Sequence, residues 1–118
     1  MPNYYTFSGL TLTGQRVYQT VYQVPGGTGA ALIKSIYCST HNTGFTGAGV
    51  TGDRDVTVRI YDDNSTRTLY IINSGLVPYQ SALNVVDGVI VLNSSDFIEA
   101  YASTGKCVDI LVNVLQMN

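Results

Sequence analysis

His41 is the single histidine of this 118-residue sequence, and it follows Cys38 by three positions. A cysteine or serine nucleophile needs a base beside it, so any catalytic triad in this chain depends on His41. In an extended strand, however, a spacing of three places two side chains on opposite faces. We therefore expect His41 to be a loop residue, and we predict no catalytic residue and no enzymatic activity.

The segment from residue 39 to 55 contains Gly47-Ala48-Gly49, a fragment that phosphate-binding loops also use. Such a loop relies on the positive end of the helix that follows it. Here the next residues, Val56-Thr57-Val58-Arg59-Ile60, alternate as a strand does. The sequence predicts a long connection between strands and no bound cofactor, and it leaves the role of the 41–55 loop open.

Metal-binding patterns are incomplete. One histidine and two separated cysteines do not supply the spaced ligands of a zinc site. Asp62, Asp63 and Asn64 carry oxygen atoms that suit calcium, but the spaced acids of an EF-hand loop are absent. Asx residues also form turns by bonding their own backbone. We predict a hairpin turn and no metal site, and cation binding at Asp62 and Asp63 stays open.

The aromatic residues favour contact with another protein. The chain has nine tyrosines and no tryptophan, and a tyrosine ring packs against a partner while its hydroxyl stays hydrogen-bonded. One group lies near the N-terminus, and a second pair is expected to share one face of a strand. The alternative is that several of these rings cover the core. The predicted partner-contact residues are Tyr4, Tyr5, Phe7, Tyr18 and Tyr22.

Composition narrows the class of partner. The net charge is −2, only 12% of residues are charged, and the six lysines and arginines stand apart, so phosphate neutralisation of nucleic acid is not expected. The sequence lacks a run of the roughly 20 apolar residues that cross a bilayer, and the N-terminus does not resemble a signal peptide. We expect synthesis in a cytoplasm, with neither nucleic acid nor membrane as partner.

Alternating apolar and polar residues predict a chain made of strands. Such a pattern with β-branched and aromatic enrichment gives about eight short strands. In residues 31–40 we expect Leu32, Ile36 and Cys38 to face inward. Cys38 and Cys107 are expected to be free buried thiols, although their pairing stays open. The prediction is an all-β, single-domain antiparallel β-sandwich or jelly-roll-like barrel over residues 1–118, with 1–12 as an extended N-terminal arm.

The order of several segments resembles small virion proteins of tailed bacteriophages. These segments are Ala-Leu-Ile-Lys-Ser-Ile-Tyr-Cys-Ser-Thr-His-Asn, Val-Thr-Val-Arg-Ile-Tyr-Asp, Phe-Ile-Glu-Ala-Tyr-Ala-Ser and Val-Asp-Ile-Leu-Val-Asn-Val-Leu, and the resemblance spans residues 16 to 116. Similar layouts occur in capsid decoration (cement) proteins and in tail- or head-associated β-sandwich subunits. The resemblance implies a homo-oligomer, with a trimer favoured, that binds a major capsid or other virion protein without catalysis.

This resemblance also implies a place in the cell, namely the virion, with assembly in the host cytoplasm. Two alternatives remain. One is a structural subunit of the phage tail, neck or fibre. The other is a carbohydrate- or ligand-binding β-sandwich module that uses exposed tyrosine rings and the 41–55 loop.

Overall fold

The computed structural model describes residues 4–12, 17–27, 29–40, 54–77, 82–102 and 108–117. These residues form two antiparallel sheets packed face to face, without a helix that could span a membrane. The strands are β1 (Tyr4–Thr11), β2 (Gln19–Gln23), β3 (Ala30–Thr40), β4 (Arg54–Asp62), β5 (Arg67–Val77), β6 (Ala82–Asn84), β7 (Ile90–Asn93), β8 (Phe97–Ala102) and β9 (Val108–Met117).

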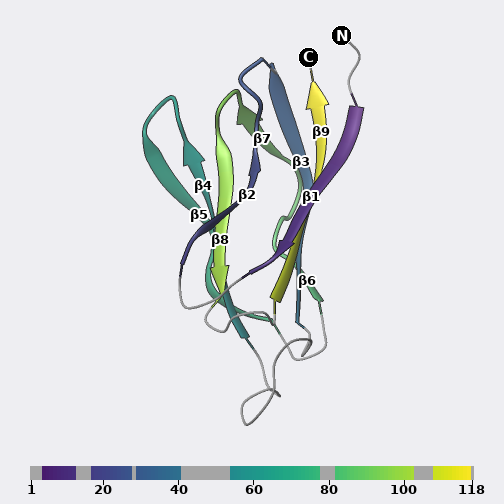
Figure 1. Ribbon diagram of the computed structural model, residues 1–118, viewed down its shortest axis with the longest axis vertical. Helices are drawn as coiled ribbons and strands as arrows, with labels where there is room; N and C mark the ends of the chain where they lie inside the picture. The colour runs from purple at the N-terminus through teal and green to yellow at the C-terminus, as the bar shows by residue number, and fades with distance from the viewer. Residues whose placement is uncertain are drawn as a thin grey trace.

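The first sheet has the order β1-β9-β3-β6, with β7 also paired to β3, and the second sheet has the order β2-β8-β4-β5 (Figure 1). The pairing is nested, because the chain doubles back at the β4–β5 hairpin. Thus β4 pairs with β5, β3 with β6 and β7, β2 with β8, and β1 with β9. This long ribbon wraps into two sheets, which is the jelly-roll form of the β-sandwich. The predicted fold class is confirmed.

The described residues form one strand more than the predicted eight because Tyr4–Thr11, predicted as part of an arm, form β1. One edge position of the roll is divided between two short strands. Both β6 and β7 pair with β3, and the segment between them includes Gly88 at a φ of +94°. A positive φ of this size suits glycine. The turn at Asp87-Gly88 therefore separates two short strands that together occupy one edge position.

The core follows from strict alternation in the central strands. In β8 and β9 every second residue is buried, so the apolar set of each strand faces the opposite sheet. Side chains from both sheets fill the space between them. The largest fully buried ones are Leu12, Ile33, Ile36, Leu92, Ile98, Ile110, Val24, Val56, Val58, Val77, Val108 and Val112.

The N-terminal residues differ from the extended arm that the sequence predicted. Tyr4 to Thr11 form β1, which pairs with β9 over its whole length, from Tyr4 opposite Gln116 to Thr11 opposite Asp109. The alternation was hidden because polar residues stand beside Leu10 on the inward side of this strand. One of them, Ser8, donates a hydrogen bond of 2.6 Å to the carbonyl oxygen of Val21 in the other sheet.

That contact exists because β2 is irregular. The register of β2 against β8 shifts between Thr20 and Tyr22, so Val21 has no partner in the ladder. A bulge of this kind leaves backbone groups unpaired, and Ser8 satisfies the Val21 carbonyl. The corner between β1 and β2 is thereby tied together across the two sheets.

Candidate interaction surfaces

The outer side of the first sheet carries a large set of apolar side chains, here called the first-sheet face. The register places Tyr5 opposite Leu115, Leu115 opposite Leu32, and Leu32 opposite Val91, so one row crosses four strands. The neighbouring rows add further large residues. The face consists of Tyr5, Phe7, Leu32, Tyr37, Val91, Leu111, Leu115 and Met117.

Several of these apolar side chains expose more than half of their surface to solvent. Tyr5 is 73% exposed, Phe7 70% and Val91 59%. Among the five strands of the first sheet, only Lys34 and Asp109 carry charge. Contiguous exposed apolar area with few charges marks sites of protein association. The predicted contact residues Tyr5 and Phe7 therefore lie on a broader surface that sequence reasoning identified only at one end.

Tyr4, the third predicted contact residue at the N-terminus, pairs through its backbone with Gln116 at the start of β1. Tyr37, Val91 and Leu111 also belong to the first-sheet face, but the sequence did not distinguish them from core residues. A signal was present in their parity, since Leu111 alternates with Ile110 and Val112 along β9.

Tyr18 lies on the outer side of the second sheet within a polar and aromatic cluster. The Arg59 guanidinium carbon is 3.4 Å from the centroid of the Tyr18 ring, and the Tyr101 ring meets Tyr18 edge-on at 4.6 Å. Burial and a hydrogen bond with Tyr70 raise the pKa of Tyr18 to about 12, against the opposing effect of Arg59. Arg59 in turn forms an ion pair with Glu99.

A second aromatic contact extends this outer surface. The rings of Tyr61 and Phe97 stack with centroids 5.0 Å apart. Together with the Tyr18 cluster they make what we call the tyrosine face, which consists of Tyr18, Tyr61, Tyr70, Phe97 and Tyr101. Most of its side chains are half-buried against one another, whereas Tyr70 is 53% exposed. The side chains of the tyrosine face are thus more buried than those of the first-sheet face.

Tyr22 does not lie on a contact surface, so its predicted role is wrong. It is only 8% exposed, and its hydroxyl oxygen accepts a hydrogen bond of 2.6 Å from Nε2 of the buried Gln116. The irregular register of β2 turns Val21 and Tyr22 both inward, so Tyr22 no longer shares a face with Tyr18. Tyr22 instead joins the two sheets across the core.

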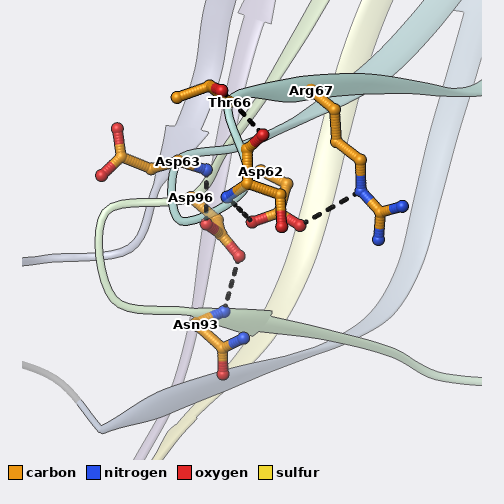
Figure 2. A network of polar contacts seen from close by, with 7 residues as sticks. Asp62, Asp63, Thr66, Arg67, Asn93 and Asp96 are labelled. Atoms are coloured by element: carbon orange, nitrogen blue, oxygen red, sulfur yellow. Dashed lines mark hydrogen bonds and ion pairs between the residues drawn. The ribbon is translucent and has the colours of Figure 1, made fainter.

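Two carboxylates near the β4–β5 turn, those of Asp62 and Asp96, bind protein groups (Figure 2). Asp96 is 4% exposed, and its carboxylate accepts hydrogen bonds from the backbone N–H of Asp63 at 3.0 Å and of Asn93 at 2.9 Å. Asp62 accepts a bond from Ser65 N–H and pairs with Arg67. Among the described residues, no cluster of metal-binding side chains occurs.

The β7–β8 turn that contains Asp96 is also tied to the end of β2. The backbone N–H of Val24 donates to the carbonyl of Asp96, and Ser95 N–H donates to the carbonyl of Val24. Ser94 Oγ donates to the carbonyl of Gly26 at 2.8 Å. Asp96 therefore holds three connections of the roll at one end of the sandwich, a structural role that the sequence analysis missed.

Most of the residues considered for catalysis or phosphate binding lie outside the described residues. His41, Cys107 and the glycine-rich segment 41–53 are not among them. Cys38 is described: it is a free, fully buried thiol, and burial raises its pKa to about 12. A thiol held this firmly in its protonated form is a poor nucleophile. The described residues enclose no pocket.

No protein-family model matches the sequence, and no curated protein matches it. Three solved structures share its fold. A Bacillus protein from disulfide-linked endospore appendage pili has a TM-score of 0.53 at 14% identity, covering 98% of this chain and 87% of its own. The Drosophila NLP core, studied for pentamer formation and histone binding, has a TM-score of 0.52 at 15% identity, covering 95% of this chain and 98% of its own.

The third is from the acid-stable capsid of a Helicobacter pylori bacteriophage, with a TM-score of 0.55 at 11% identity, covering 98% of this chain and 87% of its own. The structures similar to this chain thus include a phage capsid and a pilus. At these identities the similarity is one of fold.

Proposed function

We propose that this chain is a non-enzymatic structural subunit of a tailed-bacteriophage particle, and more specifically a capsid decoration subunit that self-associates and binds the shell. A trimer is the favoured oligomer. The observation that carries the proposal is the first-sheet face, where Tyr5, Phe7 and Val91 expose more than half of their surface on the same outer side of one sheet. A folded protein gains stability by covering such a surface with another protein.

The composition of the chain supports the same function. Few charges, many amide and hydroxyl side chains and exposed aromatic rings are typical of surfaces that form close protein contacts. The folds similar to this one come from a capsid, a pilus and a protein studied for pentamer formation. These proteins support an assembling role because each belongs to a structure built from repeated copies or associated chains.

A carbohydrate-binding module is less well supported by the tyrosine face. A sugar site needs polar side chains that are ready to bond hydroxyl groups. Here Arg59 is paired with Glu99 and bonded to Tyr70, and Tyr18 is also bonded to Tyr70. These groups are already engaged within the sheet.

The double variant Tyr5→Ser, Phe7→Ser tests the first-sheet face. Interface aromatic residues often contribute more than 1 kcal/mol each, so we expect self-association or shell binding to weaken at least about tenfold. Both side chains point to solvent in the isolated subunit, so the free energy of unfolding should change by about 1 kcal/mol or less. Light scattering after size-exclusion chromatography, over a concentration series, measures the effect on self-association.

Val17→Ser is the matched control, because Val17 is 57% exposed but lies outside the first-sheet face. It should leave the mass unchanged. An unaltered mass and unaltered shell binding in the Tyr5→Ser, Phe7→Ser variant would contradict the assigned surface.

The location in the particle needs a separate experiment. Electron microscopy of particles made with and without the gene for this chain should show density on the outer capsid that disappears in the deletion. Density on the tail or neck would favour the alternative structural role. If particles made with the gene do not contain the chain, the virion function is contradicted.

A further inference from the structure

The β5 strand is exposed over nearly all of its length. Arg67 to Tyr70 are exposed, Ile71 and Ile72 are half-buried, and only Val77, the last residue, is buried. Leu69 is 47% exposed and Leu76 is 60% exposed. The strand therefore presents apolar side chains to solvent on both of its sides, which a strand covered by its own sandwich does not do.

The backbone edge of β5 is open as well. Within the described part of the chain, β5 lies at the end of the second sheet and pairs with β4 alone. From Arg67 to Tyr70 this pairing is regular, and irregularities follow near Ile72 and Gly75. The outer edge of such a strand presents N–H and C=O groups that can pair with another strand.

The other edges are shorter or are tied to a neighbouring strand. β2 has 5 residues, β6 has 3 and β7 has 4, whereas β5 has 11. β1 is linked to the other sheet by the Ser8 hydrogen bond to Val21. Soluble proteins usually protect a long edge with charges or proline, but Arg67 is the one charged residue of β5 and the strand has no proline.

Charge indicates what kind of strand this edge can accept. Nε of Arg67 lies 3.5 Å from Oδ2 of Asp62 on the neighbouring strand, so its charge is largely balanced within the hairpin. The rest of β5 is uncharged and rich in Thr, Leu, Tyr and Ile. A strand without net charge selects neither a basic nor an acidic peptide, but two copies of it can pair without repulsion.

We propose that β5 pairs in antiparallel fashion with β5 of a second copy of this chain, about a two-fold axis near Leu69 and Tyr70. The two second sheets then form one continuous sheet across the contact. Antiparallel pairing about a two-fold axis is self-complementary, because each strand donates and accepts the same backbone hydrogen bonds. The contact also covers the exposed apolar side chains on both sides of β5.

This contact goes beyond the proposed function, because it holds whether or not the first-sheet face binds a shell. It also links the groups of copies that any other contact forms. If three copies meet through the first-sheet face, pairing of β5 joins each of them to a copy in another group. If no other contact forms, it produces a dimer.

Substitutions at Leu69 test the pairing. Near the two-fold axis each Leu69 lies close to its counterpart, so Leu69→Lys places two like charges together, as does Leu69→Glu. Either variant alone should lower the mass measured by light scattering at micromolar concentration, by half where β5 pairing is the one contact between copies. An equal mixture of the two should restore the wild-type mass, because opposite charges then meet. Leu69 is 47% exposed, and circular dichroism should show an intact β fold in both variants.

Val17→Lys is the control for adding a charge at an exposed apolar residue, and it should keep the wild-type mass. An unchanged mass in Leu69→Lys would overturn the proposal, as would a mixture that stays at the lower mass. Wild-type protein that is monomeric in solution would overturn it as well. None of these outcomes bears on whether the chain is present on phage capsids, which the particle images decide separately.

Discussion

Replacing Asp96 with alanine should lower the free energy of unfolding by about 3 kcal/mol, because two hydrogen bonds to a carboxylate are lost at once. The buried carboxylate of Asp96 binds the backbone N–H groups of Asp63 and Asn93, which belong to different turns. Without it, the end of the sandwich loses the group that joins the β4–β5 and β7–β8 connections. Urea denaturation followed by circular dichroism measures the change.

Two further variants make this prediction specific. Asp96→Asn keeps the size of the side chain but retains one acceptor oxygen, so its loss should be about half as large. Asp63→Ala removes an exposed carboxylate from the β4–β5 turn but keeps the backbone N–H that Asp96 binds. It should change the free energy of unfolding by about 0.5 kcal/mol or less. Equal losses for Asp63→Ala and Asp96→Ala would show that the Asp96 carboxylate is not the joining group.

Stability should also fall steeply in alkaline solution because of Cys38. Burial raises the pKa of this thiol to about 12 in the folded chain, whereas an unfolded cysteine titrates near a pKa of about 8.5. Below the unfolded pKa both states keep the proton, and this contribution to stability is complete. As the pH rises above about 9, only the unfolded state loses the proton, so the free energy of unfolding falls by about 1.4 kcal/mol per pH unit.

The Cys38→Ala variant isolates this effect. It should be less stable at neutral pH, by about 1 kcal/mol for the small cavity left behind, but its alkaline slope should be shallower by the amount given. Tyr18 and every other titrating group occur in both proteins, so they cancel in the difference. Denaturation curves at several values between about pH 9 and 11 measure it, and parallel pH dependences of the two proteins would contradict it.

The sequence was sufficient to predict the fold class because β8 and β9, one central strand in each sheet, alternate without interruption. Val108, Ile110, Val112 and Val114 of β9 are all buried, as their spacing indicates. The hairpin turn at residues 62–65 was likewise readable from its Asx residues, and the structure shows Ser65 N–H bonded to Asp62. Alternation and turn formation depend on residues that are close together in the chain. Both can therefore be predicted from a single sequence.

Irregular registers were not readable in the same way. In β3 the pairing with β9 shifts between Ile33 and Ser35, which changes the side on which the alternating residues lie. Leu32 is therefore half-buried on the outer side, while Ile36 and Cys38 face inward, so the predicted inward set was partly wrong. A bulge depends on the partner strand, and a period of two cannot reveal it. The misplacement of Tyr22 has the same cause in β2.

The candidate surfaces were predictable only in part. Tyr5 and Phe7 were identified from residue type, but the rest of the first-sheet face depends on which strands become neighbours. Leu115 and Val91 are far apart in the sequence and reach the same row only through the nested pairing with Leu32. The exposure of β5 has a similar origin, because nothing in Leu69 or Tyr70 indicates that this strand lies at the edge of its sheet.

The most direct test of the central claim, that this chain is an assembling structural subunit, is its mass in solution. Size-exclusion chromatography with light scattering should give a multiple of the 12.7 kDa chain mass, and mass action should favour it as concentration rises. A mass that stays at that of a single chain up to millimolar concentration would contradict self-association through either the first-sheet face or β5.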